Sequence, residues 1–382
     1  MEFLWEGLLS ITWQQMVMYV VGGLLIWLAI EKGFEPALLM PMGFGAILVN
    51  LPVSGVINQF SDGLGEVPGI IQWLFETGIE ASEAMPILLF IGIGAMIDFG
   101  PLLANPKLFL CGAAAQGGIF LTILLAAALG FDMKDAASIG IIGAADGPTS
   151  ILVSKTLQSN YVGAIAVAAY SYMALVPIIQ PFAIKLVTTK KDRAMRMPYR
   201  AQGVSRRLRI LFPIIVSVIA GLVAPSSVAL VGFLMFGNLI RECGVLTTLS
   251  QTAQNELANL ITLLLGITIS FSMKADQFVK PETLLIMGLG LVAFVLDSVV
   301  GVLFVKILNL FTPHNKINPM VGAAGISAFP MSSRVIEKLG QEADSQNHLL
   351  MHAVAANVSG QIASVVAGGV ILQYCATHMI GG

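Results

Sequence analysis

Charge is scarce in this sequence of 382 residues: Asp, Glu, Lys and Arg make up 11% of it, whereas soluble domains carry about 25%. Apolar residues make up 56%, and the mean hydropathy is +0.85. An ordinary soluble domain is therefore excluded. The apolar runs are about 18–25 residues long, the length of a membrane-spanning helix, whereas barrel strands would alternate over about ten residues. The sequence predicts an all-α polytopic membrane protein.

Cysteine and histidine are also scarce. The three cysteines (Cys111, Cys243 and Cys375) are scattered along the chain, which excludes a disulfide framework. Among the four histidines, His348 and His352 are four residues apart on one helix face, but no third ligand accompanies them. We therefore expect a polar helix face there rather than a transition-metal site.

Two kinds of hydrophobic stretch are present. Residues 135–157 and 316–338 are interrupted by Gly and Pro, and we expect re-entrant hairpins or unwound helices there. Such backbone is stable at membrane depth only where protein or a water-filled cavity satisfies its polar groups. Residues 67–80 are expected in the membrane interface. The uninterrupted apolar segments are 13–30, 36–54, 84–103, 107–130, 160–187, 210–224, 226–242, 256–273, 283–311 and 346–375.

Positive charge is concentrated in one segment, which holds nine of the 20 Lys and Arg residues against one acid, Asp192. The positive-inside rule places this segment in the cytoplasm. We expect a first transmembrane repeat at residues 1–187, a basic cytoplasmic loop at 188–209 and a second repeat at 210–382. The nine residues are Lys185, Lys190, Lys191, Arg193, Arg196, Arg200, Arg206, Arg207 and Arg209.

Four short motifs recur in the same order in the two halves. If each half crosses the membrane an odd number of times, the repeats are inverted. The broken segments would then form a core beside a scaffold, with an ion site at the pseudo-two-fold axis. The matching pairs are Met42-Gly43-Phe44-Gly45 with Met235-Phe236-Gly237, Ile91-Gly92-Ile93-Gly94 with Leu265-Gly266-Ile267-Thr268, Gly143-Ala144-Ala145-Asp146 with Gly322-Ala323-Ala324-Gly325, and Ala168-Ala169-Tyr170 with Ala355-Ala356-Asn357.

Asp146 is the only charged residue between Asp135 and Lys155, and it follows the Gly-Ala-Ala core of the first broken segment. A carboxylate at membrane depth is costly and is usually functional, as an ion ligand, a proton carrier or a substrate partner. Paired Gly/Pro-interrupted segments are typical of binding sites in secondary transporters. The residues alone therefore predict a cation-coupled membrane transporter.

Oxygen-bearing side chains accompany Asp146 in both copies of the repeat. Hard cations such as Na⁺ prefer oxygen ligands, and carbonyls freed at 143–147 and 322–325 would add to them. A single hydroxyl or amide in a membrane helix commonly serves helix–helix hydrogen bonding instead, but the clustering in both copies favours an ion site. The candidates are Asp146, Thr149, Ser150, Tyr170 and Tyr172 in the first half and Asn318, Ser327 and Asn357 in the second.

Two other charged residues each allow two interpretations. Asp297 lies in an apolar run and is either a second ion or proton site or a packing partner. Arg334 lies at the end of the second broken segment. Its guanidinium group either binds an anion, since it matches a carboxylate with two parallel hydrogen bonds, or extends from a helix end to the interface.

At these residues the chain resembles the β subunit of the sodium-translocating, biotin-dependent decarboxylases of the oxaloacetate, methylmalonyl-CoA, glutaconyl-CoA or malonate type. The resemblance covers about residues 15–375. Its most specific stretches are IGIIGAADGPTS at 139–150, AVAAYSYMALVP at 166–177, NPMVGAAGIS at 318–327 and NVSGQIAS at 357–364.

The resemblance implies a reaction and a role for each matching residue. In the family, a separate carboxyltransferase subunit moves a carboxyl group to biotin. The β subunit then decarboxylates the carboxybiotin, consumes a proton and exports Na⁺. Asp146, Tyr172 and Arg334 would take part in the reaction, with Arg334 holding the carboxybiotin carboxylate. The implied Na⁺ ligands are Asp146, Thr149, Tyr172, Asn318, Ser327 and Asn357, and Gly322 would allow a close backbone approach. Spacing does not decide between Tyr170 and Tyr172; the resemblance selects Tyr172.

The resemblance also implies partners: a carboxyltransferase or biotin-carrier subunit, a small single-span γ subunit and a homotrimer of this chain in the inner (plasma) membrane. The alternative is a Na⁺/H⁺ or Na⁺/solute secondary transporter without biotin chemistry, in which Arg334 binds a substrate anion. A further alternative is an assembly subunit without its own ion site.

Overall fold

The computed structural model describes residues 7, 9–33, 36–61, 65–81, 83–198, 203–313, 315–375 and 377. Arg200 of the basic segment lies outside these residues. Within them, five helices are long and apolar enough to cross a membrane, or up to seven if each of two bent helix pairs forms one span. The prediction of an all-α polytopic membrane protein is confirmed. The inverted relation of the two halves stays a prediction.

The long helices are joined by short ones and by turns. In chain order the helices are α2 (Trp13–Lys32), α3 (Pro36–Val49), α4 (Ile70–Phe75), α5 (Ala84–Met96), α6 (Gly100–Ala104), α7 (Phe109–Ala115), α8 (Gly117–Ala128), α9 (Met133–Gly140), α10 (Gly147–Thr156), α11 (Val162–Val187), α12 (Lys190–Arg193), α13 (Arg206–Val223), α14 (Val228–Glu242), α15 (Thr247–Thr252), α16 (Ala258–Ile269), α17 (Ala275–Phe278), α18 (Pro281–Phe311), α19 (Pro319–Ala323), α20 (Met331–Ala343) and α21 (Leu350–Cys375).

Several helices differ from the apolar segments of the sequence. The segment 107–130 is interrupted at Gln116, where α7 ends and α8 begins, and α11 is bent within its length. An antiparallel hairpin of β1 (Asn58–Ser61) and β2 (Gly65–Pro68) precedes α4. The sequence analysis missed this hairpin, although Asp62-Gly63 between its strands is a common hairpin signal.

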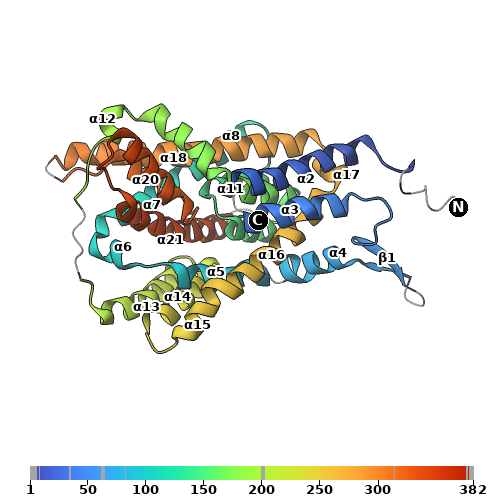
Figure 1. Cartoon of the computed structure of the whole chain (residues 1–382), viewed down its shortest axis with the longest axis horizontal. Helices are drawn as coiled ribbons and strands as arrows, with labels where there is room; N and C mark the ends of the chain where they lie inside the picture. Colours follow the sequence, from blue (N-terminus) through green and yellow to red (C-terminus); the bar gives the residue numbers. More distant parts are fainter. Residues whose placement is uncertain are drawn as a thin grey trace.

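The helices pack in two groups. The scaffold group consists of α2, α3, α5, α13, α14 and α16, and the core group of α7–α11 and α18–α21. Figure 1 shows α5, α13 and α14 along the lower side of the view and α8 and α18 along the upper side. The β hairpin lies at one end of the long axis, and α12 and α20 lie at the other end. The broken segments therefore belong to one packed unit.

Both Gly/Pro-rich segments are broken in the middle. In the first, a 3-10 turn (Ile141–Ala144) follows α9, Ala145 takes a left-handed φ of 54°, and Asp146 caps the N-terminus of α10. In the second, α19 ends at Ala323 and α20 begins only at Met331. A hydrogen bond of 2.9 Å from the amide of Ser327 to the carbonyl of Ala144 joins the two breaks. The sequence positions of both breaks thus meet in space.

Glycines allow the scaffold helices α5 and α14 to touch at their backbones. A Cβ on Gly94 of α5 would lie 1.8 Å from the carbonyl oxygen of Leu234 on α14. A Cβ on Gly237 of α14 would lie 2.0 Å from the carbonyl oxygen of Ile91 on α5. Neither position has room for a side chain, because the atoms in the way are backbone.

Gly237→Ala tests this close approach, with Gly232→Ala as a matched control on the same helix. No heavy atom lies within 4 Å of a Cβ built on Gly232. We expect G237A to destabilise the detergent-solubilised protein by about 1–3 kcal/mol, because the helices must move apart. G232A should leave the melting temperature unchanged or slightly raised, since alanine favours a helix. Equal melting temperatures for the two variants would contradict the packing described here.

Candidate functional site

Asp146 lies at the junction of the two broken segments and is only 4% exposed. Its Oδ1 accepts a hydrogen bond of 3.3 Å from the backbone amide of Thr149, as the N-cap of α10 does. Its Oδ2 accepts hydrogen bonds from the hydroxyls of Thr149 at 2.8 Å, Ser364 at 2.9 Å and Ser327 at 3.4 Å. These donors come from α10, α21 and the second break. They are all neutral, so they do not cancel the charge of a carboxylate.

The chemistry of this cluster suits a monovalent cation. Among the described residues, no three His, Cys, Asp or Glu side chains gather in a way that could hold a metal ion. One carboxylate surrounded by hydroxyls matches the single charge and the oxygen preference of Na⁺, whereas Ca²⁺ sites gather several carboxylates. Ser150, also a candidate, donates its hydroxyl to the backbone carbonyl of Asp146 and does not reach the carboxylate.

The two candidate tyrosines face different neighbours. The ring of Tyr170 packs against Gly147, the residue after Asp146, where a Cβ would lie 2.4 Å from its Cζ. The hydroxyl of Tyr170 is buried and has no hydrogen-bond partner in the described part of the chain. Tyr172 instead donates its hydroxyl to the carbonyl of Met287 on α18. In this conformation the ring of Tyr170, rather than that of Tyr172, packs on the residue that follows Asp146.

Side-chain amide groups form hydrogen bonds with the backbone of the second break. Four carbonyls, from the end of α19 into the break, each accept a hydrogen bond from the NH₂ group of an Asn or Gln, and the donors come from α11, α21 and the junction between α7 and α8. Two of these carbonyls belong to the stretch 322–325, whose carbonyls we expected to serve an ion, and protein donors partly occupy them. The pairs are Gln180 to Ala323 at 2.9 Å, Gln116 to Gly325 at 3.2 Å, Asn357 to Ile326 at 2.6 Å, and Gln361 to Ser327.

Asn357 retains a free oxygen in this arrangement. Its Oδ1 is buried and accepts no hydrogen bond from the residues that the structure describes. An unpartnered oxygen inside a protein is costly, so a ligand or water at this position would be stabilised. By sequence, Asn357 matches Tyr170 in the other half, and both present an unpartnered polar atom near a break.

The structure does not bring Asn318 to this cluster. Its side-chain NH₂ donates to the carbonyls of Arg193 and Met195, and its Oδ1 accepts from the amide of Met320 as the N-cap of α19. Gly322 does sit at a close backbone approach, but its neighbour is a helix. A Cβ there would lie 2.0 Å from the carbonyl oxygen of Gly301 on α18.

Asp297 is fully buried on α18, away from the hydroxyl cluster. Its carboxyl lies against two glycines, since a Cβ on Gly118 would be 2.0 Å from Oδ1 and one on Gly143 would be 2.7 Å from Oδ2. No other side chain among the described residues hydrogen-bonds to it. Gly143 is part of the first broken segment, so the carboxyl group of Asp297 packs directly against that segment. Both interpretations made from the sequence stay open.

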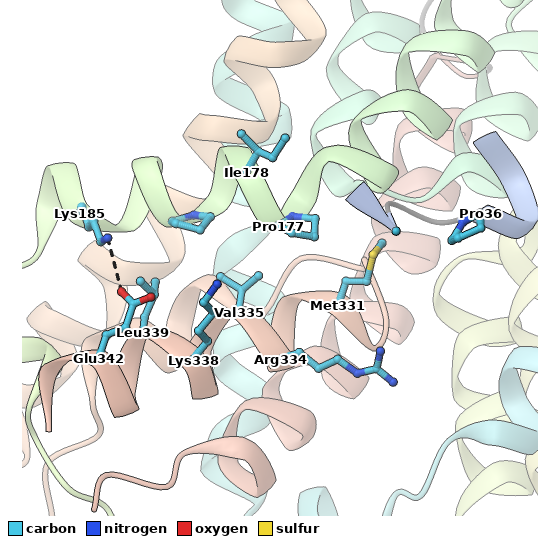
Figure 2. Close-up of a pocket in the computed structure, with 12 residues that line it drawn as sticks. Pro36, Pro177, Ile178, Lys185, Met331, Arg334, Val335, Lys338, Leu339 and Glu342 are labelled. Carbon is cyan, nitrogen blue, oxygen red and sulfur yellow. Dashed lines mark ion pairs between the residues drawn. The ribbon is translucent and has the colours of Figure 1, made fainter. Parts of the chain in front are cut away.

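Arg334 lines a cavity of about 540 Å³ between α11, α20 and the corner that joins α2 to α3. Figure 2 shows its guanidinium group extending from α20, while the ammonium group of Lys338, one turn further, points toward α11. The walls include Pro177, Ile178 and Val335. Three cationic side chains and one carboxylate also line the cavity. A cavity of this size that combines apolar walls with charged groups is suited to a small charged molecule. The residues that line this cavity come from both the core group and the scaffold group.

Glu337 precedes the cavity-lining residue Lys338 in sequence, but its carboxylate is engaged elsewhere. Partial burial alone would raise the pKa of Glu337. Hydrogen bonds from His348 and from the amides of Leu349 and Leu350 outweigh that effect, so the pKa of Glu337 lies below its ordinary value. Glu337 is thus held as an anion at the start of α21. His348 serves this contact, but it lies before α21 begins at Leu350, so it does not share a helix face with His352 as we expected.

Sequence reasoning missed Ser364 and the three glutamines that brace the second break. Ser364 lies seven residues after Asn357 on α21, which places the two on one helix face. That spacing was a usable signal. The glutamines offered none, because a glutamine that donates to a carbonyl of another segment looks like any other polar residue in a helix.

Comparison with known proteins covers nearly the whole chain. The family model described as Na⁺-transporting oxaloacetate decarboxylase beta subunit matches residues 14–375. The chain is 46% identical to the glutaconyl-CoA decarboxylase subunit beta of Acidaminococcus fermentans, over 99% of this chain and 96% of that one. It is 45% identical to the methylmalonyl-CoA decarboxylase subunit beta of Propionigenium modestum and 43% identical to the oxaloacetate decarboxylase beta chain of Klebsiella pneumoniae, over 96% of each chain.

These matches favour a subunit of a Na⁺-translocating decarboxylase complex over a stand-alone secondary transporter. They extend through both broken segments and through α20 and α21, so they include all the residues discussed above. The chain belongs to the family of Na⁺-transporting oxaloacetate decarboxylase β subunits.

Proposed function

We propose that Asp146 binds the Na⁺ that this subunit exports, together with the hydroxyls of Thr149, Ser327 and Ser364 and the amide oxygen of Asn357. The observation that carries this proposal is a buried carboxylate with three hydroxyl oxygens within 3.4 Å of its Oδ2. With Na⁺ bound, each hydroxyl would turn its hydrogen away and offer a lone pair instead.

A proton competes with Na⁺ at this carboxylate. An isolated charge is too costly to bury, so Asp146 needs one of the two cations to neutralise it. Coupling follows if Na⁺ and the proton favour different conformations, because a ligand with equal affinity for both conformations shifts neither. The subunit would then release Na⁺ on one side and return with the proton that decarboxylation consumes.

We propose that the core group moves against the scaffold group to expose Asp146 alternately to the two sides. Residues 1–187 and 210–382 would be inverted repeats on either side of the basic loop 188–209. Reciprocal packing supports this relation. First-half α3 packs on second-half α16, and second-half α14 packs on first-half α5. The repeated motifs pair α3 with α14 and α5 with α16, so a two-fold axis would interchange these two contacts.

The cavity at Arg334 is proposed to receive carboxybiotin. The guanidinium fork matches a carboxylate, and the apolar walls suit a fused-ring head group. When bound, carboxybiotin supplies a carboxyl group that leaves as CO₂. Arg334 would hold that carboxyl group, and the walls would exclude bulk water.

The remaining proposals concern the complex. Carboxybiotin would arrive on a carboxyltransferase or biotin-carrier subunit. A small single-span γ subunit and two further copies of this chain would complete the membrane part. The basic loop 188–209 would face the cytoplasm of a cell whose inner membrane holds the complex. The similar chains carry the names of three different decarboxylases, so the parent acid is not assigned to this chain.

Asp146→Asn is the first test of the ion site. In proteoliposomes of the assembled complex, we expect it to reduce both CO₂ release and carboxybiotin-driven uptake of radioactive Na⁺ to background, because the amide cannot neutralise Na⁺. Full activity of this variant would make the chain an assembly subunit. If the wild type takes up Na⁺ equally with and without carboxybiotin, the chain is a stand-alone transporter.

Ser364→Ala tests the ligand that sequence reasoning missed. We expect the Na⁺ concentration for half-maximal transport to rise about tenfold, since an interaction with a charged group contributes about 1.5–3 kcal/mol. Ser154→Ala is the control, because that hydroxyl donates only to carbonyls of its own helix. Similar Na⁺ dependence in the two variants would remove Ser364 from the site.

Tyr170→Phe and Tyr172→Phe decide which tyrosine borders the ion. We expect Tyr170→Phe to raise the Na⁺ concentration for half-maximal transport several-fold, because its ring packs on Gly147 next to Asp146 and its buried hydroxyl has no hydrogen-bond partner among the described residues. Tyr172→Phe should lower the turnover rate more than the Na⁺ affinity, since it removes a contact between α11 and α18. The reverse pattern would restore the assignment that the family resemblance implies.

A further inference from the structure

The cavity at Arg334 contains a second unpaired cation. Three cationic side chains line it: Lys185, Arg334 and Lys338. Lys185 is paired with Glu342 at 3.6 Å, as Figure 2 shows. Arg334 and Lys338 form no ion pair within the part of the chain that the structure describes, so two positive charges remain uncompensated.

No nearby acid is free to pair with Lys338. Glu337 is held by His348 and by two backbone amides, and Glu342 is paired with Lys185. In Figure 2 the Lys338 ammonium group points from α20 toward α11, next to Val335, whereas the Arg334 guanidinium group extends away from α11. Residues four apart on a helix have Cβ atoms about 5–6 Å apart, so one small ligand can contact both cations once the Arg334 side chain rotates toward Lys338.

Two cations have different effects on a decarboxylation. A cation that pairs with the carboxylate of the reactant stabilises the starting charge, and on its own it slows the loss of CO₂. As the bond breaks, the negative charge moves from the carboxyl group to the ring that it leaves. Only a cation placed at the new position stabilises the transition state more than the reactant.

We infer that Lys338 is that cation and stabilises the negative charge that develops on the ureido group of carboxybiotin. The bond between the ureido nitrogen and the carboxyl carbon breaks, its electron pair stays on the ureido group, and CO₂ leaves. A proton, from the ion site or from water, then binds to the nitrogen. This inference rests on the proposed role of the cavity, with Arg334 on the carboxylate.

The walls of the cavity increase the effect of Lys338. Pro177, Ile178 and Val335 are apolar, and Gly33 and Pro36 also line the cavity. A ligand that fills this space displaces water, which strengthens the interaction between an ammonium group and a developing anion. Lys185 lies in the same cavity but already has an anion, so it should contribute little.

Lys338→Gln in the assembled complex tests the inference, with Lys185→Gln as the matched control and free N-carboxybiotin as the probe. We expect K338Q to lower kcat for CO₂ release about 10- to 100-fold with little change in KM, because the stabilisation acts in the transition state. The carbon isotope effect on CO₂ release should rise as bond breaking becomes rate-limiting. K338R should restore most of kcat, and K185Q should change kcat less than about twofold.

Binding of biocytin, which carries no transferable carboxyl group, separates a transition-state role from a structural one. K338Q should bind biocytin as the wild type does. An unchanged kcat and isotope effect in K338Q would overturn the inference, and so would equal losses in K338Q and K185Q. Arg334→Gln tests the underlying proposal separately: it should raise KM. If R334Q leaves KM unchanged, the cavity is not the carboxybiotin site, and the role of Lys338 is rejected with it.

Discussion

The rest of the structure depends on the need to hold one carboxylate inside the membrane without a fixed counter-ion. A permanent Lys or Arg beside Asp146 would neutralise it and remove any need for Na⁺ or a proton. Neutral hydroxyls orient the carboxylate and leave its charge uncompensated. The donors come from α10, α21 and the second break, so the two breaks must meet. The hydrogen bond from Ser327 to Ala144 and the braces from side-chain amides hold that junction in place.

One short segment connects the hydroxyl cluster at Asp146 to the cavity at Arg334. Ser327 contacts Asp146, and Arg334 lines the cavity seven residues later, with the start of α20 between them. Gln180 binds both the carbonyl of Ala323 and the hydroxyl of Ser332, so α11 holds the segment on both sides of the turn. A ligand that shifts α20 would therefore move Ser327 relative to the carboxylate. This gives a physical route by which events at the cavity can change the affinity for Na⁺.

The sequence predicted the elements whose signals are local. Three signals identified Asp146 and both breaks: a carboxylate in an apolar run, Gly and Pro inside hydrophobic segments, and short motifs that recur in the same order. Each motif and each break can be recognised from a few consecutive residues. Asn318 and Tyr172 show what local signals cannot give. Asn318 is polar and begins one of the stretches that carry the family resemblance, but it caps α19 and binds the basic segment instead. The choice between Tyr170 and Tyr172 depends on the rotation of α11 about its axis, and its apolar residues cover all sides of the helix, so no stripe defines that rotation.

Glycine contacts hold helices together within the scaffold group, and an ion pair is one of the contacts between the two groups. Inside the scaffold group, Gly94 and Gly237 bring α5 and α14 into backbone contact, which fixes their relative position because no side chain can yield. Between the groups, one contact is the ion pair of Lys155 on α10 with Glu83 before α5, at 3.3 Å. A partly exposed ion pair contributes little and can break and form again at low cost, unlike a packed backbone contact. Apolar side chains of both groups also pack together in shared clusters, so the proposed motion must rearrange these contacts. Asp146 would move with the core group, because its hydrogen-bond partners Thr149, Ser327 and Ser364 all belong to it.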